Sequence, residues 1–287
     1  MKVNFFIVGA PKAGTTSLYS YLNQHHSISM SLVKEPNYFS HKEILAQKLY
    51  YKTKLITDLK KYHSLFDFKN SSCLYGEASV SYLFYNDVAT KIKEYNENAK
   101  IIILLRDPVE RAVSHYNMDK RLGFVKIDLQ SILDDISLKN HMLYYQQYIH
   151  LGLYYYQVKK YFDVFGKENV CVMKYDDLSK DNKAFTNKIT DFLSLDTDLE
   201  IDYDTPYNSY KSSSNQFINF LYSISFLRKL VSILLPSAML KKINKSFFSK
   251  PEIRISKETE MKLYDLFHED ILLLEQMLEI DLSSWKR

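Results

Sequence analysis

The sequence predicts an α/β protein with three layers, α/β/α, around a central parallel sheet. Short apolar runs rich in Ile, Val, Leu and Phe alternate along the chain with longer segments whose apolar residues recur at helical spacing. Strands separated by helices imply parallel pairing through right-handed crossovers. A glycine-containing turn joins the first apolar run to the first helical segment, and such folds bind ligands at the carboxyl ends of their strands.

The first elements are a strand over residues 3–8 (VNFFIV) and a helix over residues 15–25, which carries Leu and Tyr at helical spacing. A short strand over 73–75 and a helix over 86–96 form the next pair. The run IIILL predicts a buried strand over 101–105, and the segment after it predicts a helix over 108–122.

The second half continues with a strand over residues 169–175 (NVCVMKY) and a helix over 183–195. Near the carboxyl end, residues 256–279 carry an apolar face at helical spacing after Ser256, which is a favourable N-cap residue. We therefore expect one domain over residues 1–287, with a helical C-terminal region over about 213–287 packed on it.

Composition limits the classes of function. The formal charge of +4 is a modest bias toward anionic ligands and does not indicate nucleic acid. Cys73 and Cys171 fall in apolar runs, without metal-ligand spacing, so we expect buried free thiols and a reducing compartment. Because the chain enters its first strand at once, we expect a cytoplasmic protein.

The longest apolar stretch, residues 217–240, is interrupted by Arg228, Lys229 and Pro236, which makes it a poor transmembrane span. As a helix it is amphipathic, and several lysines follow it. Three interpretations stay open: peripheral contact of residues 217–250 with an anionic membrane, a cover over the acceptor site, or a core helix with a solvated basic end.

The first candidate site is the loop GAPKAGTT over residues 9–16. Gly9 and Gly14 keep the glycine spacing of a Walker-type phosphate loop, but Thr15 stands at the position of the Walker lysine and Lys12 lies inside the loop. Backbone N–H groups at a helix N-terminus suit an anion. Without the usual Lys-Ser/Thr pair, a nucleoside triphosphate with its metal is a poor fit.

A second stretch, residues 100–117, places Arg106 at the end of a strand and Ser114 two turns into the next helix. Asp107 is expected to cap that helix, and Pro108 suits its first turn. Both Arg106 and Ser114 would face a ligand at the carboxyl edge of the sheet. A structural salt bridge is the alternative role for Arg106.

The two stretches together resemble the PAPS-dependent sulfotransferases, whose loops read P-K-x-G-T-[ST] and R-D-P-x-x-R-x-x-S. The resemblance implies that Arg106 and Ser114 bind the 3′-phosphate of PAPS (3′-phosphoadenylyl sulfate). It also implies that the first loop binds the 5′-phosphosulfate through Lys12, Ala13, Gly14, Thr15, Thr16 and Ser17. No metal is then needed, because Lys12 can stabilise the bridging oxygen as the phosphate leaves.

Further segments resemble the branch that contains the heparan sulfate and other glycosaminoglycan sulfotransferases and their bacterial relatives. VKEPNYFS, residues 33–40, is similar to K-E-P-H-F-F, which makes Glu35 the general base. GEASVSYLF, residues 76–84, is similar to G-E-x-S-P-x-Y, which places Glu77 and Ser79 at the acceptor cleft or beside Lys12. His41 and His115 are the alternative bases.

The sequence departs from the family at Val80, which replaces a proline, and at Asn37 and Tyr38. The loop that closes over the 3′-phosphate has no clear copy. We expect its role to fall to Asn208, Lys211 and Ser212, with Arg121 or a basic tail lysine as the alternative source of positive charge.

The resemblance implies transfer of a sulfuryl group from PAPS to an acceptor hydroxyl, with an amine as the alternative, and release of 3′,5′-ADP. A glycan or a glycolipid is the expected acceptor. Two other classes stay open: a P-loop nucleotide kinase, and a non-catalytic protein that binds a nucleotide or a membrane.

Overall fold

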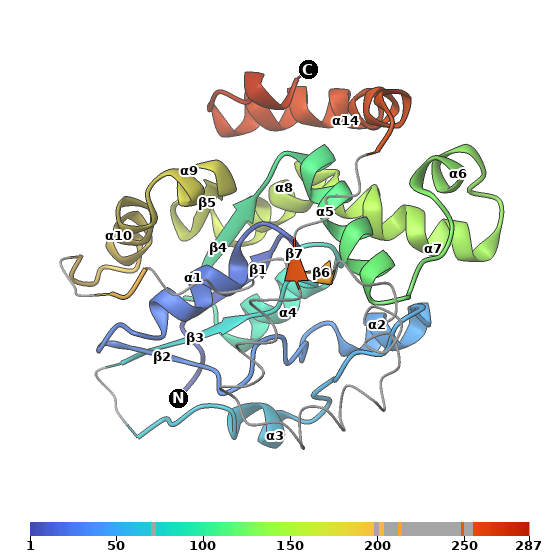
Figure 1. Ribbon diagram of the computed structural model, residues 1–287. Coiled ribbons are helices and arrows are strands. Elements are labelled where there is room, and N and C mark those ends of the chain that lie inside the picture. The colour runs from blue at the N-terminus through green and yellow to red at the C-terminus, as the bar shows by residue number, and fades with distance from the viewer. Residues whose placement is uncertain (70–72, 198–200, 204–211, 214–247, 250–254, 287) are drawn as a thin grey trace.

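The computed structural model describes residues 1–69, 73–197, 201–203, 212–213, 248–249 and 255–286 (Figure 1). Its central sheet has five parallel strands in the order β2-β3-β1-β4-β5. The strands are β1 (Phe5–Gly9), β2 (Ile28–Met30), β3 (Leu74–Ala78), β4 (Lys100–Leu105) and β5 (Val170–Lys174). The predicted fold class is confirmed.

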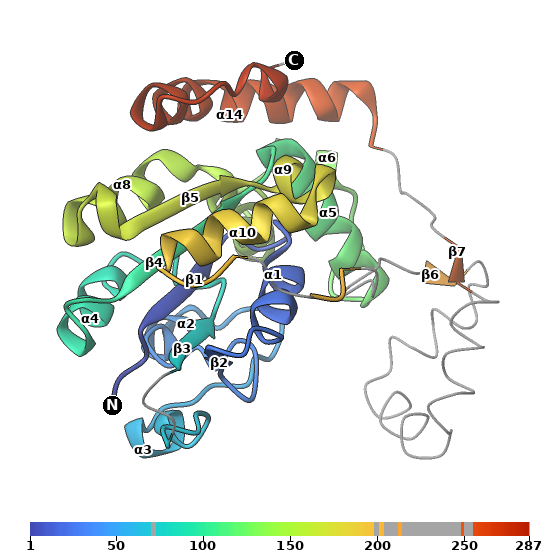
Figure 2. The same cartoon turned by 90° about the vertical axis from the view of Figure 1, so that its left-hand side faces the viewer.

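Helices cover both faces of this sheet (Figure 2). On one face α1 contacts α10, and on the other α4 contacts α8, while α14 packs outside α8 and α5. The helices are α1 (Thr15–Leu22), α2 (His41–Gln47), α3 (Leu59–His63), α4 (Val88–Tyr95), α5 (Pro108–Arg121), α6 (Leu129–Asp134), α7 (Lys139–Tyr148), α8 (Tyr154–Phe165), α9 (Tyr175–Lys180), α10 (Asn182–Phe192) and α14 (Lys257–Leu278).

The strands next to the site, β1 and β4, are almost entirely apolar and buried. All residues of β1 are buried, and so are all but the first of β4, as expected for central parallel strands covered on both faces. Both strands end at the same edge of the sheet. The loops that follow them, and the loop after β3, therefore meet at one place.

The C-terminal helix supports the same region from outside. The Ser256 side chain caps α14 as predicted, accepting from the Thr259 amide. Farther along α14, Asp270 accepts hydrogen bonds from the amides of Tyr154 and Tyr155 and so caps α8 from another element. The Tyr154 hydroxyl in turn donates to the Arg106 carbonyl, 3.0 Å away.

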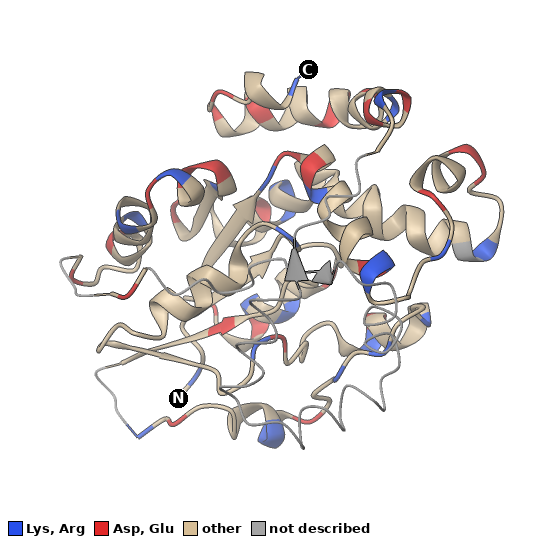
Figure 3. Cartoon of the chain, in the orientation of Figure 1, with Lys and Arg blue, Asp and Glu red and all other residues tan. Residues whose placement is uncertain are grey.

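The structure corrects two details of the sequence analysis. The edge strand β2 was not expected, because three residues are too few to show an alternating pattern. The cysteines are free thiols, but Cys73 and Cys171 are only half-buried, and Cys73 precedes β3 instead of lying in it. Lysine, arginine and acidic residues are intermixed along the described helices (Figure 3).

Most of the predicted membrane-contact segment, residues 217–250, lies outside the described residues. Within it, Phe248–Ser249 (β7) is described, and it pairs with Ser212–Ser213 (β6) as two short antiparallel strands. In the described part of the chain, no helix is both long and apolar enough to cross a bilayer.

Candidate active site

A large pocket lies at the carboxyl edge of the sheet. Its volume is about 1470 Å³, above the roughly 300–1,000 Å³ of most single-ligand sites. The loop after β1, the turn around Glu35, the loop after β3, helix α5 and helix α7 all contribute lining residues. The pocket is therefore large enough for two ligands that meet inside it.

The loop after β1 has the backbone that an anion site requires. Gly14 has a φ of +83° and is the N-cap of α1, and no side chain caps this helix. A Cβ at Gly14 would lie 2.6 Å from Leu178 and 2.9 Å from Tyr175, so glycine is needed there both for its φ and for space. The N–H groups of a first helical turn have no intrahelical partners, and the first turn of α1 lines the pocket.

The side chains of this loop divide into two groups. Gly14, Thr15, Thr16 and Ser17 line the pocket together with Lys12. Ala13 is fully buried and does not line it, and its amide donates to the Ala10 carbonyl at 3.3 Å. Of the predicted phosphosulfate-binding residues, all except Ala13 therefore face the pocket.

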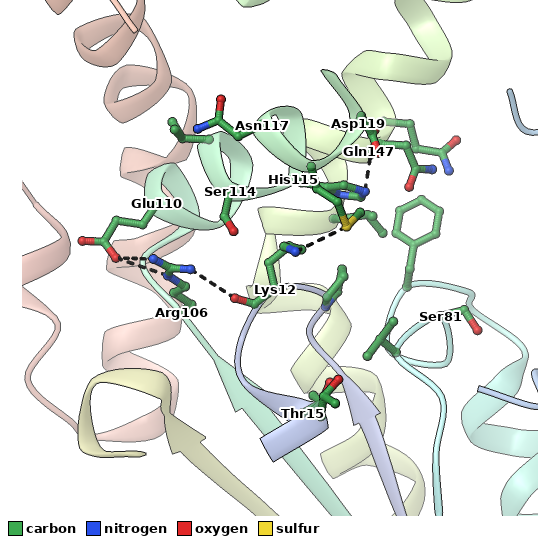
Figure 4. Close-up of a pocket in the computed structure, with 18 of the residues that line it drawn as sticks. Lys12, Thr15, Ser81, Arg106, Glu110, Ser114, His115, Asn117, Asp119 and Gln147 are labelled. Atoms are coloured by element: carbon green, nitrogen blue, oxygen red, sulfur yellow. Dashed lines mark hydrogen bonds and ion pairs between the residues drawn. The ribbon is translucent and has the colours of Figure 1, made fainter. Parts of the chain in front are cut away.

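Lys12 occupies the centre of the pocket (Figure 4). Its Nζ lies 3.4 Å from the Met118 sulfur, a weak acceptor. The pKa of Lys12 is lowered to about 8, mainly by burial and also by the charges of Arg121 and Arg106, against the opposing charges of Asp119 and Glu35. A half-buried ammonium near two guanidinium groups is a site suited to an anion.

Arg106 lies beside Lys12 at the end of β4. Its guanidinium contacts Glu110 at 3.1 Å, donates to the Lys12 carbonyl at 3.3 Å and stacks on the Tyr175 ring at 4.8 Å. Asp107 caps α5 as predicted, accepting from the amides of Val109 and Glu110. Ser114 lines the pocket from the same helix.

Figure 4 shows the arrangement around Lys12. Arg106 and Glu110 lie on one side of it, and Asp119, Gln147 and Ser81 lie on the other. Lys12, which would stand at the reacting centre, thus lies between Arg106 on one side and Asp119 and Gln147 on the other. The pocket has two ends, and Lys12 lies between them.

Glu35 lines the pocket from a strained turn. Its φ is +61° and that of Asn37 is +52°, a region that costs a non-glycine residue about 1–2 kcal/mol. The Glu35 amide donates to the Ala78 carbonyl at 2.8 Å, and its carboxylate pairs with Lys34 at 2.6 Å. The charge of Glu35 is close enough to raise the pKa of Lys12.

Glu77 and Ser79 occupy the core behind this turn. Both are fully buried and neither lines the pocket. The Glu77 carboxylate accepts from Tyr62 at 2.5 Å and from Ser79 at 2.6 Å, and the Ser79 oxygen accepts from the Asn37 amide at 3.2 Å. This placement does not support the predicted direct contact with an acceptor, because the protein covers both side chains.

Comparison with known proteins decides the family. The Sulfotransferase domain model matches residues 2–228, most of the chain and every element that builds the pocket except α14. The chain belongs to the sulfotransferase family.

Individual sulfotransferases are similar to this chain. The crystal structure of a sulfotransferase from Alicyclobacillus acidocaldarius is 28% identical and covers 100% of both chains with a TM-score of 0.75. A mouse sulfotransferase complexed with PAP is 16% identical, with a TM-score of 0.50 over 98% of this chain and 90% of that one, and shows the fold alone.

Two curated relatives match over part of their length. Carbohydrate sulfotransferase 15 from Homo sapiens is 25% identical over 244 residues, 67% of this chain and 44% of that protein. Membrane-associated sulfotransferase kil1 from Dictyostelium discoideum is 35% identical over 114 residues, 40% of this chain and 22% of that protein. The chain spans less than half the length of either relative.

The residues predicted to close over the 3′-phosphate are only partly described. Asn208 and Lys211 lie outside the described residues, and Ser212 is placed only as a backbone position in β6. Arg121, the alternative source of charge, lines the pocket. No group of His, Cys, Asp and Glu that could bind a metal occurs among the residues that the structure describes.

The two alternative bases have different placements in this sulfotransferase. His41 is not among the lining residues, and its Nδ1 lies 2.5 Å from the Tyr38 carbonyl oxygen. His115 lines the pocket, but burial and the charge of Arg111 hold its pKa well below the usual range. Because its pKa is so low, His115 is a weak base at this position.

The sequence analysis missed Asp119. It lies on α5, is 1% exposed and lines the pocket beside Lys12. Its Oδ2 accepts from the hydroxyls of Tyr50 and Tyr148. A carboxylate at i+4 from His115 on a helix that begins with the phosphate motif was the signal available in the sequence.

Proposed function

We propose that this sulfotransferase transfers a sulfuryl group from PAPS to a hydroxyl of a glycan or glycolipid acceptor and releases 3′,5′-ADP. An amine is the alternative nucleophile. The observation that carries the proposal is the position of Lys12, which lies between Arg106 and Asp119 in the pocket that Glu35 also lines.

The pocket residues fit a donor with two anionic groups. The uncapped N-terminus of α1, with Thr15, Thr16 and Ser17, suits the 5′-phosphosulfate, while Arg106 and Ser114 suit the 3′-phosphate. PAPS supplies the sulfuryl group, with 3′,5′-ADP as the leaving group. Burial, and then the charges of Arg121 and Arg106, lower the pKa of Lys12, and a bound anion would oppose both effects.

The chain's own groups then act by position and fixed charge. Lys12 stabilises the negative charge that develops on the departing phosphate oxygen. Glu35 accepts the proton of the acceptor hydroxyl, a step that contributes typically 10²–10⁴-fold. Before this proton transfer, the carboxylate must leave its ion pair with Lys34. The turn at Asn37 keeps the Glu35 backbone in place.

The nature of the acceptor rests on the relatives and on the lining. Relatives named carbohydrate sulfotransferases support a glycan, and the aromatic and amide side chains that line the pocket suit a sugar ring.

The relative named as membrane-associated supports peripheral membrane contact, and we propose the cytoplasm as the site of action. The kinase alternative gains no support, because Thr15 stands where a Walker lysine would act.

The direct test measures transfer from ³⁵S-labelled PAPS to a panel of glycosides and glycolipids, with wild type and Glu35→Gln compared. We expect the variant to lose at least about 10²-fold in kcat while its affinity for 3′,5′-ADP is unchanged. Full turnover by Glu35→Gln would exclude Glu35 as the base. Failure of the wild type to bind 3′,5′-ADP would reject the donor itself.

A further inference from the structure

The pocket beyond Lys12 has walls suited to a ring with hydroxyl groups. Its described lining there includes aromatic side chains and two glutamines: Tyr51, Phe84, Tyr85, Phe124, Gln146 and Gln147. Aromatic faces pack against the apolar faces of a sugar ring, and amides exchange hydrogen bonds with its hydroxyls. This inference rests on the proposed function, since it concerns the acceptor.

Hydrogen bonds between elements fix these walls before any ligand binds. The Tyr85 hydroxyl donates to Gln47 at 2.6 Å, and the amides of Gln47 and Gln146 face each other at 3.1 Å. The Tyr51 hydroxyl donates to Gln147 at 3.3 Å, and its ring stacks on Phe124 with centroids 6.0 Å apart. The walls are therefore preorganised, which lowers the entropic cost of binding.

Asp119 is the polar group at this end whose role the mechanism leaves open. Its side chain is 2% exposed, and the hydroxyls of Tyr50 and Tyr148 both donate to the same carboxylate oxygen, Oδ2. In the part of the chain that the structure describes, Oδ1 receives no hydrogen bond. Oδ1 does not belong to the fully buried polar atoms that lack a partner, so it is open to the pocket that Asp119 lines, where a ligand hydroxyl can donate to it.

Asp119 also lies close to the reacting centre. Its charge and that of Glu35 both raise the pKa of Lys12, and both raise the pKa of Tyr51. The two carboxylates thus share the same two neighbours, although one comes from α5 and the other from the turn before α2. A ring whose reacting hydroxyl meets Glu35 can present a second hydroxyl to Asp119.

We propose that Asp119 Oδ1 accepts a hydrogen bond from a second hydroxyl of the acceptor sugar ring, and that this position excludes a carboxylate or sulfate group. Tyr50 and Tyr148 orient the carboxylate by occupying Oδ2. A like charge placed against the buried carboxylate would be repelled. The acceptor subsite therefore selects a sugar that is uncharged at the position facing Asp119.

The test is a double-mutant cycle between the enzyme and the sugar. The best acceptor among neutral p-nitrophenyl glycosides is compared with its monodeoxy derivatives and with derivatives that carry a sulfate at each position. With the wild type, we expect one deoxy position to lower kcat/KM by about 10–150-fold, the range for a hydrogen bond to a charged group. The sulfate derivative at that position should not be an acceptor.

With Asp119→Ala, the parent glycoside and that deoxy derivative should react equally. Asp119→Asn, which keeps the shape and an acceptor oxygen, should retain part of the discrimination and admit the sulfated derivative. Tyr148→Phe removes a donor to Oδ2 but keeps the carboxylate, so it should preserve the deoxy profile. Binding of 3′,5′-ADP by each variant shows that the fold and the donor site are intact.

If Asp119→Ala discriminates between the parent glycoside and its deoxy derivatives as the wild type does, the inference is overturned. Equal changes in this discrimination in Tyr148→Phe and Asp119→Asn would also overturn it, because they would indicate a structural role for Asp119. Transfer only to glycosides with an anionic group, with none to neutral ones, would overturn it as well. Failure to accept any neutral glycoside while 3′,5′-ADP still binds rejects this subsite alone. Loss of 3′,5′-ADP binding in the wild type rejects the proposed function.

Discussion

The Ser79 hydroxyl donates to the buried Glu77 carboxylate across 2.6 Å. The Ser79 hydroxyl oxygen also accepts a hydrogen bond from the Asn37 backbone amide at 3.2 Å. The Asn37 side chain in turn donates to the Glu35 carbonyl at 2.8 Å. The carboxylate in the core is thus connected through a serine to the turn that presents the proposed base. Glu77 and Ser79 therefore support the turn that carries Glu35, and neither of them lines the pocket.

Ser79→Ala should therefore lower turnover without weakening donor binding. Without the hydroxyl, the Asn37 amide loses its acceptor and the Glu35 turn loses one of its anchors. We expect kcat to fall about tenfold, equivalent to about 1.4 kcal/mol, with the Kd for 3′,5′-ADP unchanged. Ser179→Ala on the exposed face of α9 is the matched control. Equal kcat for the two variants would contradict the positioning role.

Glu77 should make stability depend on pH. Burial raises its pKa to about 7 from 4.5, against the hydrogen bonds from Ser79, Tyr62 and Tyr82. Between pH 4.5 and 7 the folded protein therefore binds more protons at Glu77 than the unfolded chain does. The stability that protonated Glu77 contributes is complete below about pH 4.5 and is lost as the pH rises through 7. The free energy of unfolding of the wild type, relative to Glu77→Gln, should fall across this window.

The measurement is urea unfolding of both proteins between pH 4 and 8. The total change should be on the order of 3 kcal/mol, since each pKa unit corresponds to about 1.4 kcal/mol. A difference that is constant with pH, or one that grows as pH rises, would show that Glu77 is not protonated in this window.

Lys12 should make donor binding depend on pH in the alkaline range. Its pKa is lowered to about 8 in the free protein, and a bound phosphate would raise it. The affinity for 3′,5′-ADP should therefore be level from pH 7 to about 8 and then fall up to tenfold per pH unit. Calorimetric titration from pH 7 to 9.5 tests this, with Lys12→Gln expected to bind weakly at every pH.

Arg106 should distinguish donors that carry a 3′-phosphate. Its guanidinium is held by Glu110 and by the Lys12 carbonyl, so its position is fixed before binding. Arg106→Ala should weaken 3′,5′-ADP about 10–150-fold, as for a charge-assisted hydrogen bond, and leave ADP nearly unaffected. An equal loss for both nucleotides would place the contact at the 5′ end.

The sequence predicted the parts of the site that depend on neighbouring residues. Gly14 and Thr15 are in one loop, and Arg106, Asp107 and Ser114 are within one strand–helix unit, so their spacing already places them at one edge of the sheet. The cap at Asp107 and the helix ending at residue 278 follow from the same local rules.

Contacts between distant segments could not be predicted in this way. Ser79 meets Asn37 across 42 residues, and Tyr50 meets Asp119 across 69. Whether Glu77 reaches the pocket or the core depends on which face of β3 it occupies. The strand has only five residues, so its sequence alone does not determine the register of its pairing. The burial of Glu77 is therefore a structural finding.

In the proposed function, the pocket binds a nucleotide through both a 5′-phosphate and a 3′-phosphate. The most direct measurement compares thermal unfolding with 3′,5′-ADP, with ADP, and with ATP plus Mg²⁺. A ligand at a hundred times its Kd adds about 2.7 kcal/mol to stability, a rise of several degrees in Tm. Selective stabilisation by 3′,5′-ADP is the predicted result, and stabilisation only by ATP with Mg²⁺ would contradict it and favour a kinase.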